Sequence, residues 1–441
     1  MSAAPVIEAA VPAASDAVLS RLEEMLTWSQ SLIPDPAGGV DQVGFTRDGL
    51  VADATRIDRI ATLERLQASL EAAKAVEMVA FAQSQTAEQI GLGVHPRAIG
   101  RGIADQIALA SHVSPAEGTR RLHTARDLVL DLPHTLTLLS RGDLSGWTVR
   151  CVTEKLSHLD RTTRTHVDTA LTARHLARMS TKEAAACAQR LAYTADPAAA
   201  MARAGKARTD RRVTLRPAPD TMSLLTGLLP VEQGVACLAA LQAAASQSKA
   251  DGDPRSKGQI MADTLVARLT GQATAENVGV EVGIQLPLAA LLDPNDSTPA
   301  EIPGWGCLPA ALARELITNT QARVWWRRLF TRPTADGGQQ VVDLDRRRRR
   351  FTGWLAELIR WRDWTCRDPY CDAPIRHLDH LHRHHDGGPT TPTNGRGVCE
   401  RGNYVREMPG WTIRLVDPDT HTVITTTPTG HRYVSRPPQP P

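Results

Sequence analysis

The sequence of 441 residues predicts a mainly α protein, with an α+β connector after the helices and a small C-terminal module rich in cysteine and histidine. Three observations predict this architecture. The chain is rich in alanine, the residue of highest helix propensity, and only 4% of its residues are aromatic, which argues against a pure β-sandwich. Apolar residues recur every three or four positions in the N-terminal half, as amphipathic helices require. Cysteine and histidine gather between residues 366 and 399.

The order of these patterns divides the chain into four expected parts. Residues 1–15, rich in alanine and proline, predict a disordered tail, and residues 16–210 predict a helical domain. Residues 211–345 predict the α+β connector, and residues 346–441 the C-terminal module, which closes with β-strands over residues 411–416 and 421–426. A chain of this length has room for about two to four domains, each with a buried core.

Helix signals recur through the second part. Apolar residues at helical spacing predict an amphipathic helix over residues 57–85. Ser114 is an N-cap signal, because proline follows it at the first helical position and glutamate stands three residues after the serine. Ser180 has the same glutamate spacing, and Ser145 can cap the helix that follows it. We therefore expect a bundle of helices.

The connector mixes two patterns. Residues 212–215 and 278–284 alternate between apolar and polar or small residues, which is typical of strands. Residues 231–245 and 259–269 have the apolar spacing of helices. Strands and helices are therefore both expected in this part of the chain.

Charge is unevenly distributed along the chain. The formal net charge is +3, but the residues from 321 onward hold 20 arginines against 13 acidic residues, a balance of +7 that leaves −4 for the first 320 residues. Five consecutive arginines, Arg346, Arg347, Arg348, Arg349 and Arg350, contribute to this excess. Such a run is more often a solvated face than a binding site. Its place beside the cysteines and histidines nevertheless favours nucleic acid as a partner.

Nothing in the sequence predicts export or insertion into a membrane. The N-terminal residues lack the basic segment and apolar core of a signal peptide, and no apolar run approaches the roughly 20 residues that span a bilayer. We expect a cytoplasmic protein. Its seven cysteines, an odd number in a reducing compartment, are not expected to form a disulfide framework.

Three of the cysteines, Cys366, Cys371 and Cys399, lie in the same stretch as five histidines. The histidines fall within nine residues, and they are His377, His380, His382, His384 and His385. No other region of the sequence has this density of metal-binding residue types. The pattern is typical of a metal-binding tract.

Four polar residues of this stretch match the needs of phosphodiester hydrolysis, which requires a base, a divalent cation and groups that hold both. Asp379 and His380 are neighbours, so on an extended segment they point to opposite sides and can have different roles. The carboxylate can bind a hard cation while the imidazole acts as the base. Asn403 can add a second oxygen ligand, and Asn394 an orienting amide.

Together these residues resemble the HNH endonuclease motif in its HNN form, which builds a ββα-metal site. Segments before the motif and one segment after it resemble proteins in which this module follows a helical domain of unknown function, number 222, so the connector is expected to continue that domain. The matching segments are Asp131-Leu132-Pro133, Gly142 to Ser145, Arg211 to Leu215, Leu228 to Pro230, Arg255 to Leu265, Arg362-Asp363 and Pro428 to Tyr433. The resemblance spans most of the chain.

The resemblance implies a metal-dependent endonuclease, a hydrolase that cleaves phosphodiester bonds of DNA. It makes His380 the general base that activates water. Asp379 and Asn403 would hold Mg²⁺ or another divalent cation, and Asn394 would fix the orientation of the histidine. Candidates for contacts with DNA phosphates are Arg346, Arg347, Arg348, Arg349, Arg350, Arg383 and Arg396.

The resemblance also implies a structural zinc site built from two pairs of ligands. Cys366 and Cys371 form the first pair, and Cys399 should be followed three positions later by cysteine or histidine. Position 402 is glycine, so three thiolates are present where a structural zinc site needs four ligands. We therefore expect no structural zinc. The alternative is that His377 or another nearby histidine replaces the missing ligand.

Two other functions stay open at the level of sequence. The C-terminal module can be a DNA-binding module that derives from an HNH nuclease and has lost catalysis. His380 argues against this function, because a pure binding module has no use for a base beside a metal-binding carboxylate. Alternatively, the helical domain serves protein–protein assembly. Its amphipathic stripes are the support for this function, and such stripes more often face a core.

Overall fold

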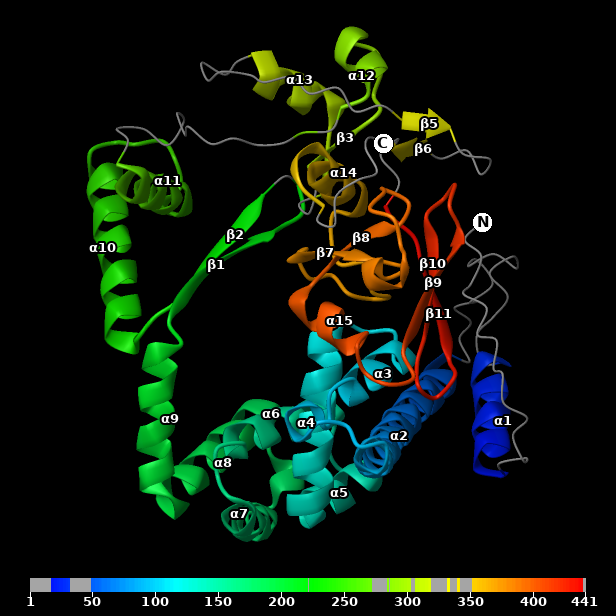
Figure 1. The fold of residues 1–441 in the computed structure, drawn as a ribbon. Helices are drawn as coiled ribbons and strands as arrows, with labels where there is room; N and C mark the ends of the chain where they lie inside the picture. Colours follow the sequence, from blue (N-terminus) through cyan, green and yellow to red (C-terminus); the bar gives the residue numbers. More distant parts are fainter. Residues whose placement is uncertain are drawn as a thin grey trace. The chain divides into compact units, whose positions relative to one another are not determined.

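The computed structural model describes residues 17–31, 49–220, 222–271, 284, 286–302, 306–318, 331–333, 339–341 and 351–438 (Figure 1). The chain forms two structural units. The first contains residues 1–197, 405–413 and 424–434, and the second contains residues 198–404, 414–423 and 435–441. The predicted tail, residues 1–15, and the arginine run, residues 346–350, lie outside the described residues.

The first unit is built mainly from helices. In chain order they are α1 (Ala17–Ser31), α2 (Gly49–Gly91), the 3₁₀ turn η3 (Pro96–Ala98), α3 (Ile103–Ala110), α4 (Pro115–Asp131), α5 (Pro133–Ser140), α6 (Gly146–Leu156), α7 (Arg161–Ala173), η4 (Leu176–Arg178) and α8 (Thr181–Ala195). The predicted N-caps are confirmed. The side chains of Ser114, Ser145 and Ser180 accept hydrogen bonds from backbone N–H groups in the first turns of α4, α6 and α8. The mainly α character predicted from composition is confirmed as well.

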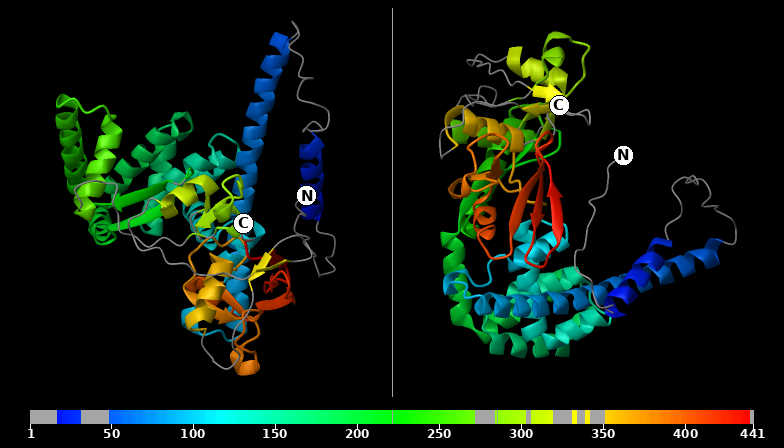
Figure 2. Two further views of the ribbon diagram at one scale, coloured as in Figure 1. Left: turned by 90° about the horizontal axis from the view of Figure 1, so that it is seen from above. Right: turned by 45° about the vertical axis from the view of Figure 1, so that its right-hand side comes forward.

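Helix α2 is one continuous helix of 43 residues, longer than predicted at both ends (Figure 2). The apolar stripe predicted for its buried face is wrong, because Ile57, Ile60 and Leu63 are each more than 40% exposed. The buried apolar positions are Ala68, Ala72, Ala75, Val79 and Ala82. Alanine permits a close approach of neighbouring helices, and α4 and α5 pack against α2. The small side chains, rather than the large apolar ones, therefore face the core.

The second unit combines helices with short antiparallel hairpins. Its first part contains α9 (Pro197–Thr209), β1 (Arg212–Pro217), β2 (Ser223–Leu228), α10 (Val231–Ala250), α11 (Lys257–Thr270), α12 (Leu288–Leu292), β3 (Ala300–Ile302), β4 (Gly306–Leu308), α13 (Ala310–Thr318), β5 (Thr331–Pro333) and β6 (Gln339–Val341). Strand β1 pairs with β2, β3 with β4 and β5 with β6. The predicted helices 231–245 and 259–269 are confirmed by α10 and α11, and the strand 212–215 by β1. The predicted strand 278–284 lies, except for residue 284, outside the described residues.

The C-terminal residues add a helix, a hairpin, a short helix and a sheet. The elements are α14 (Gly353–Asp363), β7 (His377–His380), the 3₁₀ turn η5 (His384–Asp386), β8 (Gly395–Val398), α15 (Glu400–Val405), β9 (Thr412–Asp417), β10 (Thr422–Thr426) and β11 (Arg432–Ser435). Strands β9 and β10 confirm the strands predicted over residues 411–416 and 421–426. Strand β11 was not predicted, and the three form a sheet in the order β11-β10-β9.

Strands β7 and β8 pair antiparallel, and α15 follows β8 directly, so these elements have the order β-β-α (orange in Figure 1). This order positions the candidate site, because the two strands and the helix carry most of the residues selected from the sequence. Within the described part of the chain, no helix combines the length and the apolar character needed to cross a membrane.

Candidate functional site

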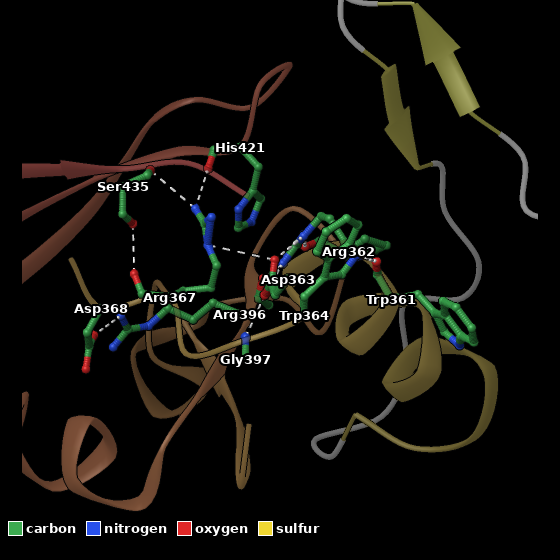
Figure 3. A network of polar contacts seen from close by, with 12 residues as sticks. Trp361, Arg362, Asp363, Trp364, Arg367, Asp368, Arg396, Gly397, His421 and Ser435 are labelled. Carbon is green, nitrogen blue, oxygen red and sulfur yellow. Dashed lines mark hydrogen bonds and ion pairs between the residues drawn. The ribbon is translucent and has the colours of Figure 1, made fainter. Parts of the chain in front are cut away.

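A buried ion pair at the end of α14 fixes the start of the site (Figure 3). Asp363 is 1% exposed, and its two carboxylate oxygens accept hydrogen bonds of 2.7 and 2.9 Å from the guanidinium of Arg362. The same carboxylate accepts a hydrogen bond of 2.7 Å from the backbone N–H of Gly397 in β8. Arg362 also donates to the carbonyl oxygens of Pro392 and Gly395. The buried ion pair of Arg362 and Asp363 therefore connects α14 to β8 through hydrogen bonds.

Arg367 and His421 complete this network, and burial controls their protonation. Arg367 donates to the carbonyl oxygens of His421 and Ser435 (Figure 3). Burial raises the pKa of Asp363, but the charge and hydrogen bonds of Arg362 and the charge of Arg367 outweigh it, so this pKa lies below its ordinary value. Burial lowers the pKa of Arg367 to about 10. Burial and the charge of Arg362 lower the pKa of His421 to about 3, so this histidine is neutral at pH 7.

The β7–β8 hairpin carries the predicted base. His380 is the last residue of β7 and pairs in register with Gly395 of β8. Its ring is half-buried, and its Nε2 lies 2.9 Å from Oγ1 of Thr390. The centroid of the ring lies 4.4 Å from that of Phe351 and 5.5 Å from that of His384. These contacts hold the imidazole in one orientation.

Asp379 has different neighbours from His380, as expected for adjacent residues of a strand. Its carboxylate lies 3.3 Å from Nε of Arg396, the residue opposite it in β8. Arg396 is completely buried and also contacts Asp368, at 2.7 Å. Burial lowers the pKa of Arg396, but the charges of Asp368 and Asp379 outweigh burial and leave the pKa above its ordinary value. This burial removes Arg396 from the candidate phosphate contacts, because its guanidinium does not reach the surface.

Asn394 holds the loop between β7 and β8. Its side-chain oxygen accepts a hydrogen bond of 2.8 Å from the N–H of His382, and its amide nitrogen donates to the carbonyl oxygens of His382 and Pro389. The contacts of this amide are therefore with loop backbone, whereas the side chain of Thr390 contacts His380. Sequence reasoning missed Thr390. Its signal was its place at the end of the Gly-Gly-Pro-Thr turn.

The other predicted residues lie on neighbouring segments. Asn403 is half-buried in α15, and its N–H donates to the carbonyl oxygen of Cys399. Arg383 is half-buried and immediately precedes η5. His377, the first residue of β7, is exposed. The β-β-α segment thus carries Asp379 and His380 on its first strand and Asn403 on its helix.

Three buried cysteines form a candidate metal centre. The Sγ atoms of Cys366, Cys371 and Cys399 all lie within 4.8 Å of one another, and those of Cys371 and Cys399 are 3.9 Å apart. Thiolates bound to one zinc ion at about 2.3 Å in a tetrahedral arrangement stand about 3.8 Å apart. The cluster could therefore hold a metal ion. Among the described residues, no histidine contributes a ligand atom to it, and His377 does not replace the missing ligand.

Hydrogen bonding gives the three thiols different pKa values. Hydrogen bonds from Cys366 and Cys371 lower the pKa of Cys399 to about 2, and the backbone N–H of Gly402 donates to the same sulfur at 3.2 Å. The hydrogen bond with Cys371 raises the pKa of Cys366 above its ordinary value. The site therefore stabilises a thiolate at Cys399, and thiolate is the form that binds metal ions.

The fold and the site define a class of protein, a mainly helical chain with a C-terminal hairpin and helix beside a three-cysteine cluster. The chain belongs to the family described as Domain of unknown function (DUF222), whose profile matches residues 60–363. This match confirms the resemblance to the helical domain number 222. It ends at Asp363, so the hairpin, the cysteines and the residues selected for their likeness to the HNH motif follow it in the chain.

The similar curated proteins come from Mycobacterium tuberculosis. Uncharacterized protein Rv3776 of strain ATCC 25618 / H37Rv is 30% identical over 181 residues, which are 39% of this chain and 32% of that protein. Uncharacterized protein Rv2100 of the same strain and uncharacterized protein MT2160 of strain CDC 1551 / Oshkosh are each 40% identical over 85 residues, 19% of this chain and 15% of theirs. This chain thus matches less than a third of the length of each relative. No solved structure matches it at a significant level.

Proposed function

We propose that the C-terminal module is a metal-dependent endonuclease of the HNH type that hydrolyses phosphodiester bonds of DNA. The observation that carries the proposal is the fixed imidazole of His380 at the end of the first strand of a β-β-α segment. Asp379 precedes it and has different neighbours, and Asn403 lies on the helix of the same segment. The resemblance of these residues to the HNN form of the motif supports the same function.

In this function His380 is the base that activates water. When its Nε2–H donates to Thr390, the basic lone pair of the neutral ring is on Nδ1. Nδ1 then takes a proton from a water molecule while the water oxygen attacks phosphorus, and the bond from phosphorus to the leaving sugar oxygen breaks. Phe351 and His384 flank the ring, so its orientation is set before the reaction begins.

Asp379 and Asn403 offer oxygen ligands of the kind that Mg²⁺ and other hard divalent cations prefer. A cation bound there neutralises negative charge on the phosphate and on the leaving oxygen. Asn394 acts as a positioning residue, because it fixes the loop backbone next to Thr390, which contacts the base. Each of the four residues selected from the sequence thus has a distinct role in the proposal.

One observation favours a second candidate function, DNA binding without catalysis. The buried guanidinium of Arg396 lies 3.3 Å from the carboxylate of Asp379 and offsets the negative charge that a cation ligand needs. In this function the excess positive charge from residue 321 onward, including Arg383 and the run 346–350, attracts the phosphate backbone. The hairpin then has a structural role.

Cleavage of supercoiled plasmid DNA with Mg²⁺ or Mn²⁺ distinguishes the two functions. The variants are His380→Ala and, as a matched control, His385→Ala, which alters a histidine of the same tract whose side chain is 69% exposed. Loss of the base should slow cleavage by about 10²- to 10⁴-fold. The control should cleave at the wild-type rate, and all three proteins should bind DNA equally in fluorescence anisotropy.

Two results contradict the proposal, the first by excluding catalysis and the second by excluding His380 as the base. If the wild-type protein binds the plasmid and leaves it intact with either metal ion, the module binds DNA without cleaving it. If His380→Ala cleaves as fast as His385→Ala, the base is another group. The salt dependence of binding, measured in the same anisotropy titrations, reports how many phosphates the protein contacts in either case.

A further inference from the structure

The three-cysteine cluster lacks a fourth protein ligand, and the fold brings a carboxylate to its side. A Cβ atom added to Gly402 would lie 1.8 Å from Oδ2 of Asp368 and 3.6 Å from Sγ of Cys399. Asp368 Oδ2 therefore occupies the space that a side chain at position 402 would fill. Glycine at this position is what permits the close approach of the carboxylate to the cluster.

The contacts of Asp368 hold its Oδ1 and leave its Oδ2 beside Gly402 and the cluster. Oδ1 accepts a hydrogen bond of 2.7 Å from the buried guanidinium of Arg396. No group among the described residues donates a hydrogen bond to Oδ2. The backbone carbonyl of Asp368 accepts a hydrogen bond of 3.1 Å from the N–H of Cys371, so a tight turn holds the aspartate beside two of the three cysteines. Carboxylates that bind metal ions commonly have their second oxygen held in this way.

We propose that Asp368 is the fourth ligand of a tetrahedral zinc site whose other ligands are Cys366, Cys371 and Cys399. The three sulfur atoms lie within 4.8 Å of one another and Asp368 is outside that group, so Oδ2 would reach the ion by a rotation of the side chain about the Oδ1 contact with Arg396. The backbone of Asp368 already lies in the same loop as two of the ligands. Zinc accepts a carboxylate oxygen at about 2.0–2.2 Å in the same coordination shell as thiolates at about 2.3 Å. Three soft thiolates exclude Mg²⁺ and Ca²⁺, which prefer shells made of oxygen.

A buried positive charge beside the cluster favours a ligand set of three thiolates and one carboxylate. Three thiolates and one carboxylate carry four negative charges, of which a divalent ion neutralises two. Arg396 is completely buried, contacts Asp368, and interacts electrostatically with the sulfur of Cys366. Its Nη2 has no hydrogen-bond partner among the described residues. A buried cation with an unused donor thus adjoins the site and offsets part of the remaining negative charge.

This zinc site involves neither Asp379 nor Asn403, so the inference does not rest on the nuclease proposal. Its role is to tie the loop before β7 to the turn between β8 and α15, since the ligands come from these two segments. Metal binding of this kind contributes directly to the stability of a small module.

The zinc affinity of the purified full-length protein tests the site. Zinc content measured by mass spectrometry, and competition with a chromophoric chelator, are compared for wild type, Asp368→Asn and Asp372→Asn. Asp372 is the matched control, an exposed aspartate of the same loop. We expect one zinc ion per wild-type chain, and an affinity in Asp368→Asn reduced by at least the roughly 10- to 100-fold that loss of an outer partner of a metal ligand costs. The control should keep the wild-type affinity.

Absence of stoichiometric zinc from the wild-type protein, or equal affinities of Asp368→Asn and Asp372→Asn, overturns the proposal. An exchange of ligands then tests the same point independently of how well Asp368→Asn folds. The double variant Asp368→Ala with Gly402→Cys removes the carboxylate and adds a thiol in the vacated space. It should bind zinc as tightly as the wild type or more tightly.

Cobalt identifies the ligands of both proteins directly. With Co²⁺ in place of zinc, the wild type should show the visible absorption of a tetrahedral ion with three thiolates. The double variant should show a stronger sulfur-to-cobalt charge-transfer band, because a fourth thiolate has replaced the carboxylate. A double variant that binds no metal ion, or that has the same cobalt spectrum as the wild type, contradicts the assignment of Asp368.

Discussion

Replacement of Asp363 by asparagine should destabilise the C-terminal module, because it removes a buried negative charge and one of the two oxygens that accept hydrogen bonds from Arg362. The carboxylate lies between Arg362 and Arg367, whose side chains are 7% and 3% exposed, and it accepts the N–H of Gly397 in β8 (Figure 3). Asparagine has nearly the same volume and still offers an oxygen to Gly397. The substitution therefore leaves two buried guanidinium groups without their anionic partner, and it places an amide NH2 group, a donor, where Oδ1 accepts a hydrogen bond from Nε of Arg362.

The size of the effect follows from the burial of these groups. Removal of one member of a buried ion pair costs about 3–5 kcal/mol. Because asparagine keeps the acceptor for Gly397, we expect the lower end, about 3 kcal/mol. At about 1.4 kcal/mol for each factor of ten, this raises the population in which β8 is detached from α14 about 100-fold.

Hydrogen exchange of the peptide that contains β8, followed by mass spectrometry, measures this opening directly. A local measurement is needed, because one melting curve of a chain with two units mixes their transitions. The control is Asp372→Asn, which removes an exposed carboxylate of the same module. Exchange in β8 that is as slow in Asp363→Asn as in the control would refute the view that the buried ion pair fastens this strand.

Two further predictions concern buried groups, one in the same network as Asp363 and one in the helical unit. The pKa of His421 in the folded protein, about 3, lies below its ordinary value of 6.5, so its stabilising effect is complete above pH 6.5 and is lost as the pH falls toward 3. The free energy of unfolding of the wild type, measured by urea titration, should therefore fall by up to about 1.4 kcal/mol per pH unit between pH 6.5 and pH 3. In His421→Gln the free energy of unfolding should fall less steeply with pH. Equal pH dependence of the two proteins would contradict the low pKa of His421. Asp168 in α7 is fully buried and accepts hydrogen bonds from the N–H groups of His134 and Thr135 at the start of α5. Asp168→Ala should lower the free energy of unfolding of the helices, measured by circular dichroism, by about 3 kcal/mol or more. The control Asp160→Ala, which removes an exposed N-cap, should lower it by about 1 kcal/mol. Equal losses in the two variants would show that burial of the Asp168 carboxylate is unimportant.

The helices were predictable because their signals are local. The caps at Ser114, Ser145 and Ser180 each depend on residues within one turn, and each is present in the structure. The buried face of α2 was not predictable in this way. Its large apolar residues near Ile57 are exposed while its alanines are buried, since the choice of face depends on which helices pack against it.

The sequence by itself determined the cysteine spacing and the adjacency of Asp379 and His380, and its resemblance to the HNH motif implied the β-β-α order. The tertiary structure decided which partners these residues meet. It buries Arg396 between two carboxylates, where the sequence predicted a surface contact with phosphate, and it places Thr390 against His380.

The missing fourth cysteine shows the same division. The sequence revealed Gly402 as a gap in the ligand set, but only the folded chain shows that Asp368, 34 positions earlier, fills the space beside it. The physical reason is the distance along the sequence over which each interaction acts. Helix propensity, capping and strand alternation act over a few residues, whereas burial, ion pairing and metal ligation join groups that become neighbours only when distant segments pack together.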